Sequence, residues 1–292
     1  MLLHKEWGKH LRTGNWLFKY AGMIGLAERY NTNIALPDHF IWKYLEHPPE
    51  IDNGISVDIE LKSPTWEPCP EFWDIHKKDI QEKNVNISLD TFLQSEDNWA
   101  HCKDKVIQNL QFKEEYIDKA WEWTIQELKD AGINWEDIYY KKDIVGISVR
   151  RGDFVGHGCF KQIGPEWFIS AASKHFDVPN TVFFIFSDDI EWCKQVFNFP
   201  MQIFAPANNT HLTDQENYHR DPMWQMILGS EICNGFVVSN STFSWWMAYL
   251  ATAFGGKVIR PNGFFDGDYK KMYNDEYYYP KNWITHEDNS TD

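Results

Sequence analysis

Two adjacent arginines, Arg150 and Arg151, are the side chains of this sequence best suited to bind an anion. Guanidinium groups donate paired hydrogen bonds to phosphate or carboxylate oxygens, and they stay charged at physiological pH. Gly152 lets the backbone turn closely after them, and Asp153 supplies a carboxylate that could order the loop through an ion pair. Because one carboxylate would leave two buried arginines with surplus charge, the pattern favours an anionic ligand over a purely structural pair.

A second candidate is a run of small polar residues that follows the apolar segment 235–239 and leads into a predicted helix. Hydroxyl groups and unbonded backbone N–H groups at the start of a helix bind phosphate oxygens, although helix capping alone would explain one or two of these residues. The run consists of Asn240, Ser241, Thr242 and Phe243. Together with the two arginines, it predicts a diphosphate site.

Two pairs of carboxylates have simpler interpretations. Asp188 and Asp189 stand where a helix begins, so capping is their favoured role and Mg²⁺ binding is the alternative. Asp266 and Asp268 flank a glycine, and neither pair has further ligands at a suitable spacing. We therefore predict no metal ion and no other cofactor.

The elements that must position these residues follow from the hydrophobic pattern after residue 142. Short apolar runs at 144–149, 181–186, 235–239 and 257–259 alternate with helical patterns at 165–175, 189–197, 223–233 and 242–254. Near-continuous Val, Ile and Phe runs separated by helices predict an α/β domain with a doubly wound parallel sheet. Ligands of such sheets bind at the carboxyl ends of the strands, which is where the arginines and the polar run stand.

The first half of the chain has a weaker pattern. A helix is expected over 16–30, and the turn before it, with Arg12, Gly14 and Asn15, indicates by itself no more than a helix cap. Prolines between 47 and 70 favour turns and extended chain, and an amphipathic helix is expected over 112–129. A length of 292 residues then suggests two α/β domains, 1–141 and 142–292.

Composition excludes several classes of partner. The chain has 28 Lys and Arg against 43 Asp and Glu, a net charge of −15, which argues against a nucleic-acid or anionic-membrane footprint. Aromatic residues make up 16%, and a core role is favoured over a carbohydrate-binding surface, with Trp42, Trp66 and Trp73 left as candidates for the latter. The five cysteines have no metal-site spacing and fit reduced thiols.

The start of the sequence shows no apolar run of the kind found in a secretory signal peptide. No signal peptide precedes the first predicted helix, and no apolar run approaches 18 residues. We therefore expect a cytoplasmic protein without a transmembrane segment. A trimmed anchor and peripheral association with a membrane are left open, and so is the oligomeric state.

Four blocks in this order resemble the motifs of glycosyltransferase family 11, the α-1,2-fucosyltransferases. Residues 12–21, RTGNWLFKYA, resemble the family's opening G-x-L-G-N-Q-x-F-x-Y-A, and residues 149–154, VRRGDF, resemble H-x-R-R-G-D. Residues 184–189, FIFSDD, form the third block, and residues 239–246, SNSTFSWW, resemble N-S-S/T-F-S-W-W. The resemblance runs from about 12 to 265 and is thin between 31 and 140.

This resemblance implies two Rossmann-like domains of the GT-B-like kind and a metal-independent, inverting transfer of L-fucose. The donor would be GDP-fucose, held mainly by the second domain, and the acceptor would be the 2-hydroxyl of a galactose-containing glycan. It further implies that Arg150 clamps the β-phosphate beside Arg151, and that the turn of Asn240, Ser241, Thr242 and Phe243 contributes hydroxyl and backbone donors. Arg12, Gly14 and Asn15 would lie near the sugar and phosphates.

Departures from the motifs leave alternatives open. Ser148 stands where the family has His, and Met226 stands where an acidic residue is often found, with Asp221 five residues further upstream. A related inverting transferase with another nucleotide sugar or acceptor is therefore a second hypothesis, and a non-catalytic sugar- or nucleotide-binding protein is a third. The general base is not identified. Asp153 is the carboxylate nearest in sequence to the two arginines. Its two candidate roles are that of the general base and that of a partner that orients Arg150 or Arg151.

Overall fold

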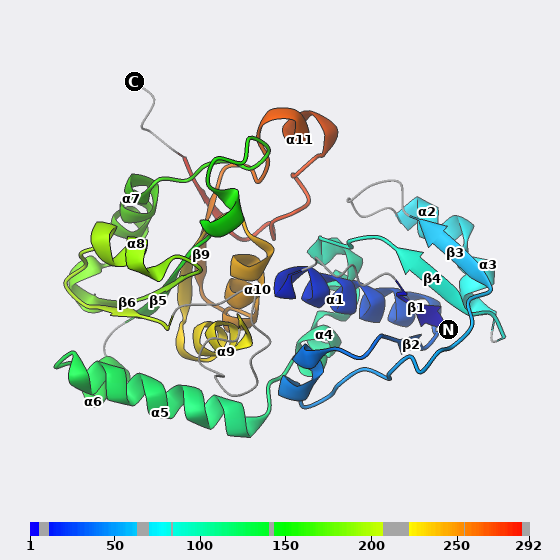
Figure 1. Ribbon diagram of the computed structural model, residues 1–292, viewed down its shortest axis with the longest axis horizontal. Coiled ribbons are helices and arrows are strands. Elements are labelled where there is room, and N and C mark those ends of the chain that lie inside the picture. Colours follow the sequence, from blue (N-terminus) through cyan, green and yellow to red (C-terminus); the bar gives the residue numbers. More distant parts are fainter. Residues whose placement is uncertain are drawn as a thin grey trace. The chain divides into compact units, whose positions relative to one another are not determined.

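The computed structural model describes residues 1–5, 12–62, 70–82, 84–139, 143–206, 222–253 and 255–287 (Figure 1). The chain divides into two compact units: Met1–Lys113 with Tyr273–Pro280, and Glu114–Met272 with Lys281–Asp292. The predicted boundary between 141 and 142 falls on undescribed residues. Helix α5 (Glu114–Asp130) lies before that boundary but groups with the second unit, because it packs on helix α9 (Pro222–Ile232).

The first unit contains a parallel four-stranded sheet in the order β2-β1-β4-β3. Its strands are β1 (Leu2–Leu3), β2 (Ile34–Ala35), β3 (Ile59–Lys62) and β4 (Ile87–Asp90). We predicted no individual strands here, since segments of two to four residues are too short to show a period.

Helix α1 (Thr13–Tyr30) is the long helix of the first unit, and it confirms the helix predicted over 16–30. It ends at Asn31, whose left-handed φ of 52° is a conformation that asparagine tolerates. The shorter helices of the unit are η1 (Phe40–Tyr44), α2 (Pro70–Ile75), α3 (Lys77–Gln81), η2 (Glu96–Asn98), η3 (Ala100–Cys102) and α4 (Lys103–Asn109).

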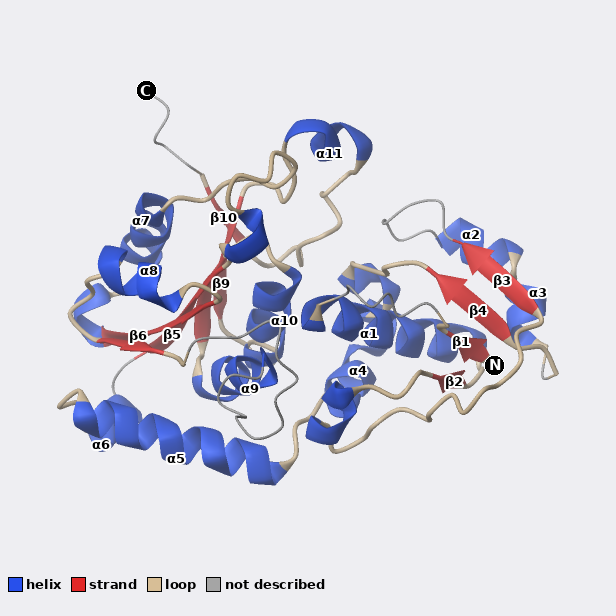
Figure 2. Ribbon diagram, viewed as in Figure 1, coloured by secondary structure: helices blue, strands red, loops and turns tan. Residues whose placement is uncertain are grey.

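The second unit contains a parallel six-stranded sheet in the order β10-β9-β8-β5-β6-β7, which confirms the predicted α/β class with a parallel sheet (Figure 2). The strands are β5 (Asp143–Val149), β6 (Thr181–Ser187), β7 (Gln202–Phe204), β8 (Gly235–Val238), β9 (Lys257–Pro261) and β10 (Ile284–His286). The four predicted runs correspond to β5, β6, β8 and β9, while the three-residue edge strands β7 and β10 were not predicted.

The helices of the second unit lie where the periodicity placed them. The helix predicted over 165–175 is α7 (Pro165–His175), and the other three predicted segments correspond to α8 (Ile190–Val196), α9 and α10 (Thr242–Ala251). The remaining helices are α6 (Trp135–Tyr139), η4 (Gly152–Phe154), η5 (Val178–Asn180) and α11 (Gly267–Met272). In α5 the buried stripe is Ala120, Thr124 and Leu128, and Thr124 satisfies its hydroxyl by donating to the Ala120 carbonyl.

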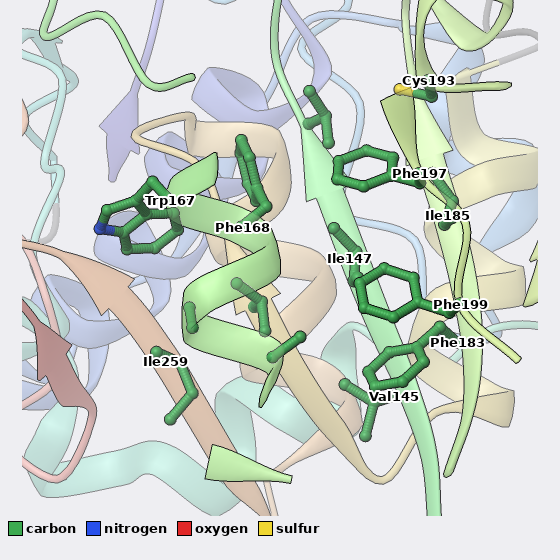
Figure 3. Close-up of a cluster of buried hydrophobic side chains, with 14 of the residues drawn as sticks. Val145, Ile147, Trp167, Phe168, Phe183, Ile185, Cys193, Phe197, Phe199 and Ile259 are labelled. Carbon is green, nitrogen blue, oxygen red and sulfur yellow. The ribbon is translucent and has the colours of Figure 1, made fainter. Parts of the chain in front are cut away.

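Alternation along β5 divides its side chains between the two faces of the sheet. Val145, Ile147 and Val149 join a buried cluster with residues of β6, α7 and α8, part of which Figure 3 shows. Ser148 lies on the opposite face, where its hydroxyl meets a side chain of α10. One face of β5 therefore builds the core, and the other supplies a polar group next to the end of the strand.

The described tryptophans belong mainly to the core. Trp245 and Trp246, inside the motif block at 239–246, are completely buried in α10, and Trp245 stacks on Tyr249 with ring centroids 4.5 Å apart. Trp42 and Trp73 are buried as well, which argues against their presentation to a sugar. Trp66 lies outside the described residues. Burial in the core therefore accounts for these four tryptophans.

Candidate functional site

The order in which strands are added to the second sheet reverses between β5 and β8. From β5 the strands proceed to β6 and β7 on one side, and from β8 they proceed to β9 and β10 on the other. In open α/β sheets, ligands bind outside the carboxyl ends of the strands at this switch point. Arg150 directly follows β5, and Ser241 stands three residues after β8, so both predicted elements of the diphosphate site lie at this location.

A small cavity of about 10 Å³ opens at the switch point. It brings together Arg150, Ser241 and Phe243, three of the residues predicted to bind the donor. The remainder of its lining consists of Ser148, Val149, Ser187, Asp188, Gln225 and Ser244. Arg151, Asp153, Asn240 and Thr242 are adjacent in sequence to the lining but are not part of it.

The guanidinium of Arg150 is held from two sides. Its Nη1 lies 2.8 Å from Oδ2 of Asp188, and its Nη2 donates to Oδ1 of Asp153. The side chain is 10% exposed, while that of Asp188 is 7% exposed and that of Asp153 is 47% exposed. Since Arg has five N–H donors and these two pairs engage one on each Nη, further donors are available for a ligand in the cavity.

Arg151 is fixed to the start of α8 instead. Its Nε donates to Oδ2 of Asp189 at 3.1 Å, and its guanidinium lies 3.8 Å from the ring centre of Trp192. The backbone N–H of Arg151 donates to Oδ1 of Asp188 at 2.9 Å. Asp188 therefore binds both the side chain of one arginine and the backbone of the next.

The charge count that favoured an anionic ligand is wrong. From the sequence we counted one carboxylate, that of Asp153, beside the two arginines. In the structure Asp188 and Asp189 form ion pairs with them as well. The cause is the register of the sheet, since β6 runs parallel to β5 and its end brings two further aspartates to the arginines. The site therefore offers directed N–H groups rather than surplus positive charge.

Gly152 has a steric role beside this network. A Cβ atom at that position would collide with the Asp188 carboxylate. A larger residue would force Asp188 away from Arg150. The glycine is thus required by the close approach of the loop to the carboxylate as well as by the turn.

Helix caps account for part of the polar residues, as predicted. Ser241 precedes α10, and its Oγ accepts from the N–H of Phe243 at 3.2 Å. Asp189 precedes α8, and its Oδ1 accepts from the N–H of Trp192 at 3.3 Å. The first turn of α10 adds the positive end of a helix dipole to the cavity wall.

Three serines form a buried hydroxyl chain, and two of them, Ser148 and Ser244, line the cavity. Oγ of Ser244 lies 2.7 Å from Oγ of Ser148 and 2.9 Å from Oγ of Ser239. Ser148 is 3% exposed, so the serine that replaces the motif histidine is integrated into the packing between β5 and α10. Asn240 also has a structural role, because its amide donates to the carbonyls of Lys161 and Phe264 at 3.0 and 2.8 Å.

Gln225 and Ser244 line the cavity; Ser244 lies inside the motif block at 239–246, whereas Gln225 did not stand out in the sequence. Gln225 is 1% exposed, and its Nε2 donates to the carbonyls of Ser187 and Pro206 at 3.2 and 2.6 Å. The signal that identifies it is a single amide within the apolar stretch 223–228, where a buried polar group requires partners. Met226, the position matching the family's acidic residue, is fully buried, and Asp221 lies outside the described residues.

Three predicted site residues belong to the first unit. Arg12 precedes α1 without a side-chain capping bond, and Gly14 is buried in the first helical turn. Oδ1 of Asn15 accepts from Nε2 of Gln94 at 2.8 Å. The expected cap by the Asn15 side chain is therefore not observed, since that oxygen is bound to another amide.

The alternative metal sites have other contacts. Oδ1 of Asp266 accepts from the N–H of Gly267 at 2.8 Å, and Asp268 pairs with Lys271 at 3.0 Å. Within the described ranges, no three His, Cys, Asp or Glu side chains gather as metal ligands would. In the same ranges, no helix has both the length and the apolar character needed to cross a bilayer.

Comparison with known proteins identifies relatives among glycosyltransferases. The model of the family described as Glycosyl transferase family 11 matches residues 94–287. An alpha-1,2-colitosyltransferase of Escherichia coli is 31% identical over 137 residues, which are 44% of this chain and 44% of that protein. The human galactoside alpha-(1,2)-fucosyltransferase 1 is 24% identical over 156 residues, 49% of this chain and 38% of that protein. The matched parts thus span less than half of these relatives.

Solved structures share the fold across most of the chain. The fucosyltransferase NodZ from Bradyrhizobium matches with a TM-score of 0.51 at 15% identity, over 85% of this chain and 92% of its own. FUT1 of Arabidopsis thaliana matches with a TM-score of 0.53 at 13% identity, over 90% of this chain and 70% of its own. At such identities the likeness concerns the fold. The family match covers well over half of the chain, and this protein belongs to glycosyl transferase family 11.

Proposed function

We propose that this protein is an inverting galactoside α-1,2-fucosyltransferase, which moves L-fucose from GDP-fucose to the 2-hydroxyl of a galactose-containing glycan. The observation that carries the proposal is the cavity at the switch point, where Arg150 and the start of α10 face the same space. Backbone N–H groups at a helix start together with a fixed guanidinium suit a diphosphate.

The names of the relatives agree with this substrate class. The human relative is a galactoside alpha-(1,2)-fucosyltransferase, and one NodZ structure was soaked with GDP-fucose and matches with a TM-score of 0.54 at 15% identity. We extend these properties to this chain as part of the proposal, with a GT-B-like pair of Rossmann-like domains as its architecture.

The chemical step requires stabilisation of the leaving group. As the bond between fucose and the β-phosphate breaks, positive charge develops at the anomeric carbon and negative charge on the diphosphate. We assign the largest stabilisation to Arg150, because a donor fixed before the reaction needs no reorganisation as charge develops. Asp153 and Asp188 hold its guanidinium in place. This contact makes Asp153 a positioning residue in the proposal rather than the general base.

The remaining donors come from α10 and, in the proposal, from the first unit. Ser241, Thr242 and Phe243 would present hydroxyl and backbone groups to the phosphates, while Arg151 fixes the loop through Asp189. We assign Arg12, Gly14 and Asn15 to the sugar and phosphates on the strength of the family motif. Since arginine and N–H groups perform the neutralisation, we propose that transfer needs no metal ion, and EDTA should leave the rate unchanged.

A second candidate function is transfer of another sugar by the same mechanism. Two observations favour it: an alpha-1,2-colitosyltransferase is among the relatives, and Ser148 replaces the motif histidine with a hydroxyl bound to Ser244. The change alters the polar groups beside the cavity, and with them the contacts open to the donor.

A donor panel distinguishes these functions. Purified protein is incubated with galactosides and with GDP-fucose, GDP-mannose, UDP-sugars or a colitose-bearing nucleotide donor, and nucleotide release is measured. The proposal expects release with GDP-fucose that depends on the galactoside. Release with another donor alone would support the second candidate, and ligand binding without release from any donor would indicate a binding protein.

A further inference from the structure

The cavity at the switch point contains an amide to which the proposed function gives no role. Gln225 lines this cavity near the start of α9, and its side chain belongs to a residue that is 1% exposed. Its Nε2 donates to the carbonyls of Ser187 and Pro206 at 3.2 and 2.6 Å. Because an amide nitrogen carries two protons, both donors are used, and the orientation of the amide is fixed.

The oxygen of this amide is the atom that remains for a ligand. Within the described residues no group donates to Oε1 of Gln225, although an amide oxygen can accept two hydrogen bonds. The oxygen is not sealed in the protein, unlike the completely buried Oε1 of Gln94, and the side chain borders the cavity. Since an unpaired carbonyl oxygen in a buried side chain is costly, we expect a donor group to enter the cavity beside it.

A diphosphate cannot provide that donor. Arg150 and the start of α10, with Ser241 and Phe243, line the same cavity and supply the groups that donate to anionic oxygens. The diphosphate of a nucleotide sugar is fully ionised at neutral pH, so its oxygens accept hydrogen bonds and donate none. Another part of the same ligand must therefore meet Oε1 of Gln225.

The volume of the cavity limits what this part can be. About 10 Å³ is room for one water-sized group, so a hydroxyl fits beside Gln225, whereas the ring of a nucleobase does not. A hydroxyl can donate to Oε1 and at the same time accept from a donor of the lining. In a nucleotide sugar, hydroxyls stand on both sides of the diphosphate: those of the ribose and those of the transferred sugar.

We infer that Gln225 is a specificity-determining residue, whose Oε1 accepts a hydrogen bond from a hydroxyl of the nucleotide sugar next to the diphosphate. The inference rests on the proposed function for the identity of the ligand. The ribose and the transferred sugar are the two sources of this hydroxyl, and the chemistry is the same in both cases. Because Ser187 and Pro206 hold the amide nitrogen, Oε1 is in position before the ligand binds.

The test uses Gln225→Met, which keeps the length of the side chain and removes both polar atoms of the amide. Gln202→Met is the matched control. Gln202 also ties the backbone of the second unit, since its Nε2 donates to the carbonyl of Phe197 at 3.3 Å and its Oε1 accepts from the N–H of Phe199 at 2.9 Å, but it does not line the cavity. Calorimetry without acceptor measures the Kd of pyrophosphate, which has no hydroxyl, of GDP, which adds the ribose, and of GDP-fucose, which adds the sugar.

We expect Gln225→Met to raise the Kd of GDP-fucose about tenfold relative to Gln202→Met and to leave the Kd of pyrophosphate unchanged. A rise already seen with GDP assigns the hydroxyl to the ribose, and a rise seen only with GDP-fucose assigns it to the transferred sugar. An equal rise with pyrophosphate would show that Gln225 only maintains the shape of the site, and no rise at all would show that Oε1 meets only water. Either result overturns the inference.

A second measurement removes the hydroxyl from the ligand instead, and so it does not depend on the folding of a variant. Among analogues of GDP and GDP-fucose that each lack one hydroxyl, one should bind wild-type protein about tenfold more weakly than its parent, and Gln225→Met should bind the two equally. Equal binding of every analogue to wild-type protein would overturn the inference. Wild-type protein that binds GDP but transfers no fucose would overturn the proposed function instead, while the Kd values still decide the role of Gln225.

Discussion

Replacement of Arg150 by Ala should destabilise the second unit by leaving a carboxylate buried without its partner. Asp188 is 7% exposed, and its Oδ2 lies 2.8 Å from Nη1 of Arg150. Removal of one member of a buried pair costs about 3–5 kcal/mol. Since the N–H of Arg151 still donates to Asp188, we expect about 3 kcal/mol, a large part of the 5–15 kcal/mol typical of a folded protein.

Asp188→Asn should cost less, because Arg150 retains its pair with Asp153. In the double variant the amide removes the unpaired charge, so Arg150→Ala/Asp188→Asn should be more stable than Arg150→Ala alone. The coupling free energy of the cycle should be about 1–3 kcal/mol. Equilibrium unfolding in urea, followed by tryptophan fluorescence, measures all four proteins under the same conditions.

Additive effects within about 0.5 kcal/mol would refute the buried-pair reasoning. The cycle also decides how activity data are to be interpreted. Loss of turnover in Arg150→Ala combines any loss of transition-state stabilisation with the disturbance of Asp188. Functional tests therefore need a variant that retains a cation.

Three further predictions concern single residues. Arg150→Lys keeps a charge but not the forked pairs, and kcat should fall about 10²–10³-fold in a nucleotide-release assay while Tm stays close to wild type; unchanged kcat would remove Arg150 from the mechanism. Gly152→Ala should lower Tm and raise the Kd of GDP by displacing Asp188, whereas Gly158→Ala, whose Cβ would meet nothing within 4 Å at a position without a positive φ, is the matched control and should leave both close to wild type. Burial lowers the pKa of His4 from 6.5 to about 4, so the unfolded chain takes up this proton first as the pH falls. The free energy of unfolding found above pH 6.5 should decline by up to about 3 kcal/mol as the pH falls to 4. In urea unfolding, His4→Gln should show a weaker dependence of this free energy on pH; the same dependence as in the wild type would contradict the role of His4.

The second unit was largely predictable because two of its strands, β5 and β6, are long and buried on both faces. β5 and β6 each have seven residues, and their near-continuous apolar character can be recognised without any alignment. In the first unit, β1 and β2 have two residues each and show no period. Their pairing depends on contacts between distant segments, which local pattern does not encode.

The candidate site divides in the same way. Arg150 and Ser241 could be found because residue type and position at the end of a strand both point to phosphate chemistry. The pairing of Asp188 and Asp189 with the arginines required the register of β5 and β6. Gln94 lies 79 positions from Asn15 in the sequence, so no local pattern could have joined them.

The central claim is tested most directly by the structure of the product. Wild-type protein is incubated with GDP-fucose and a panel of β-galactosides without added metal, and the glycans are analysed by linkage-resolved mass spectrometry and NMR. We expect a single fucose joined α-1,2 to galactose, with formation strongly reduced in Arg150→Lys. A product with another sugar or linkage, or no product from GDP-fucose while the protein remains folded, would contradict it.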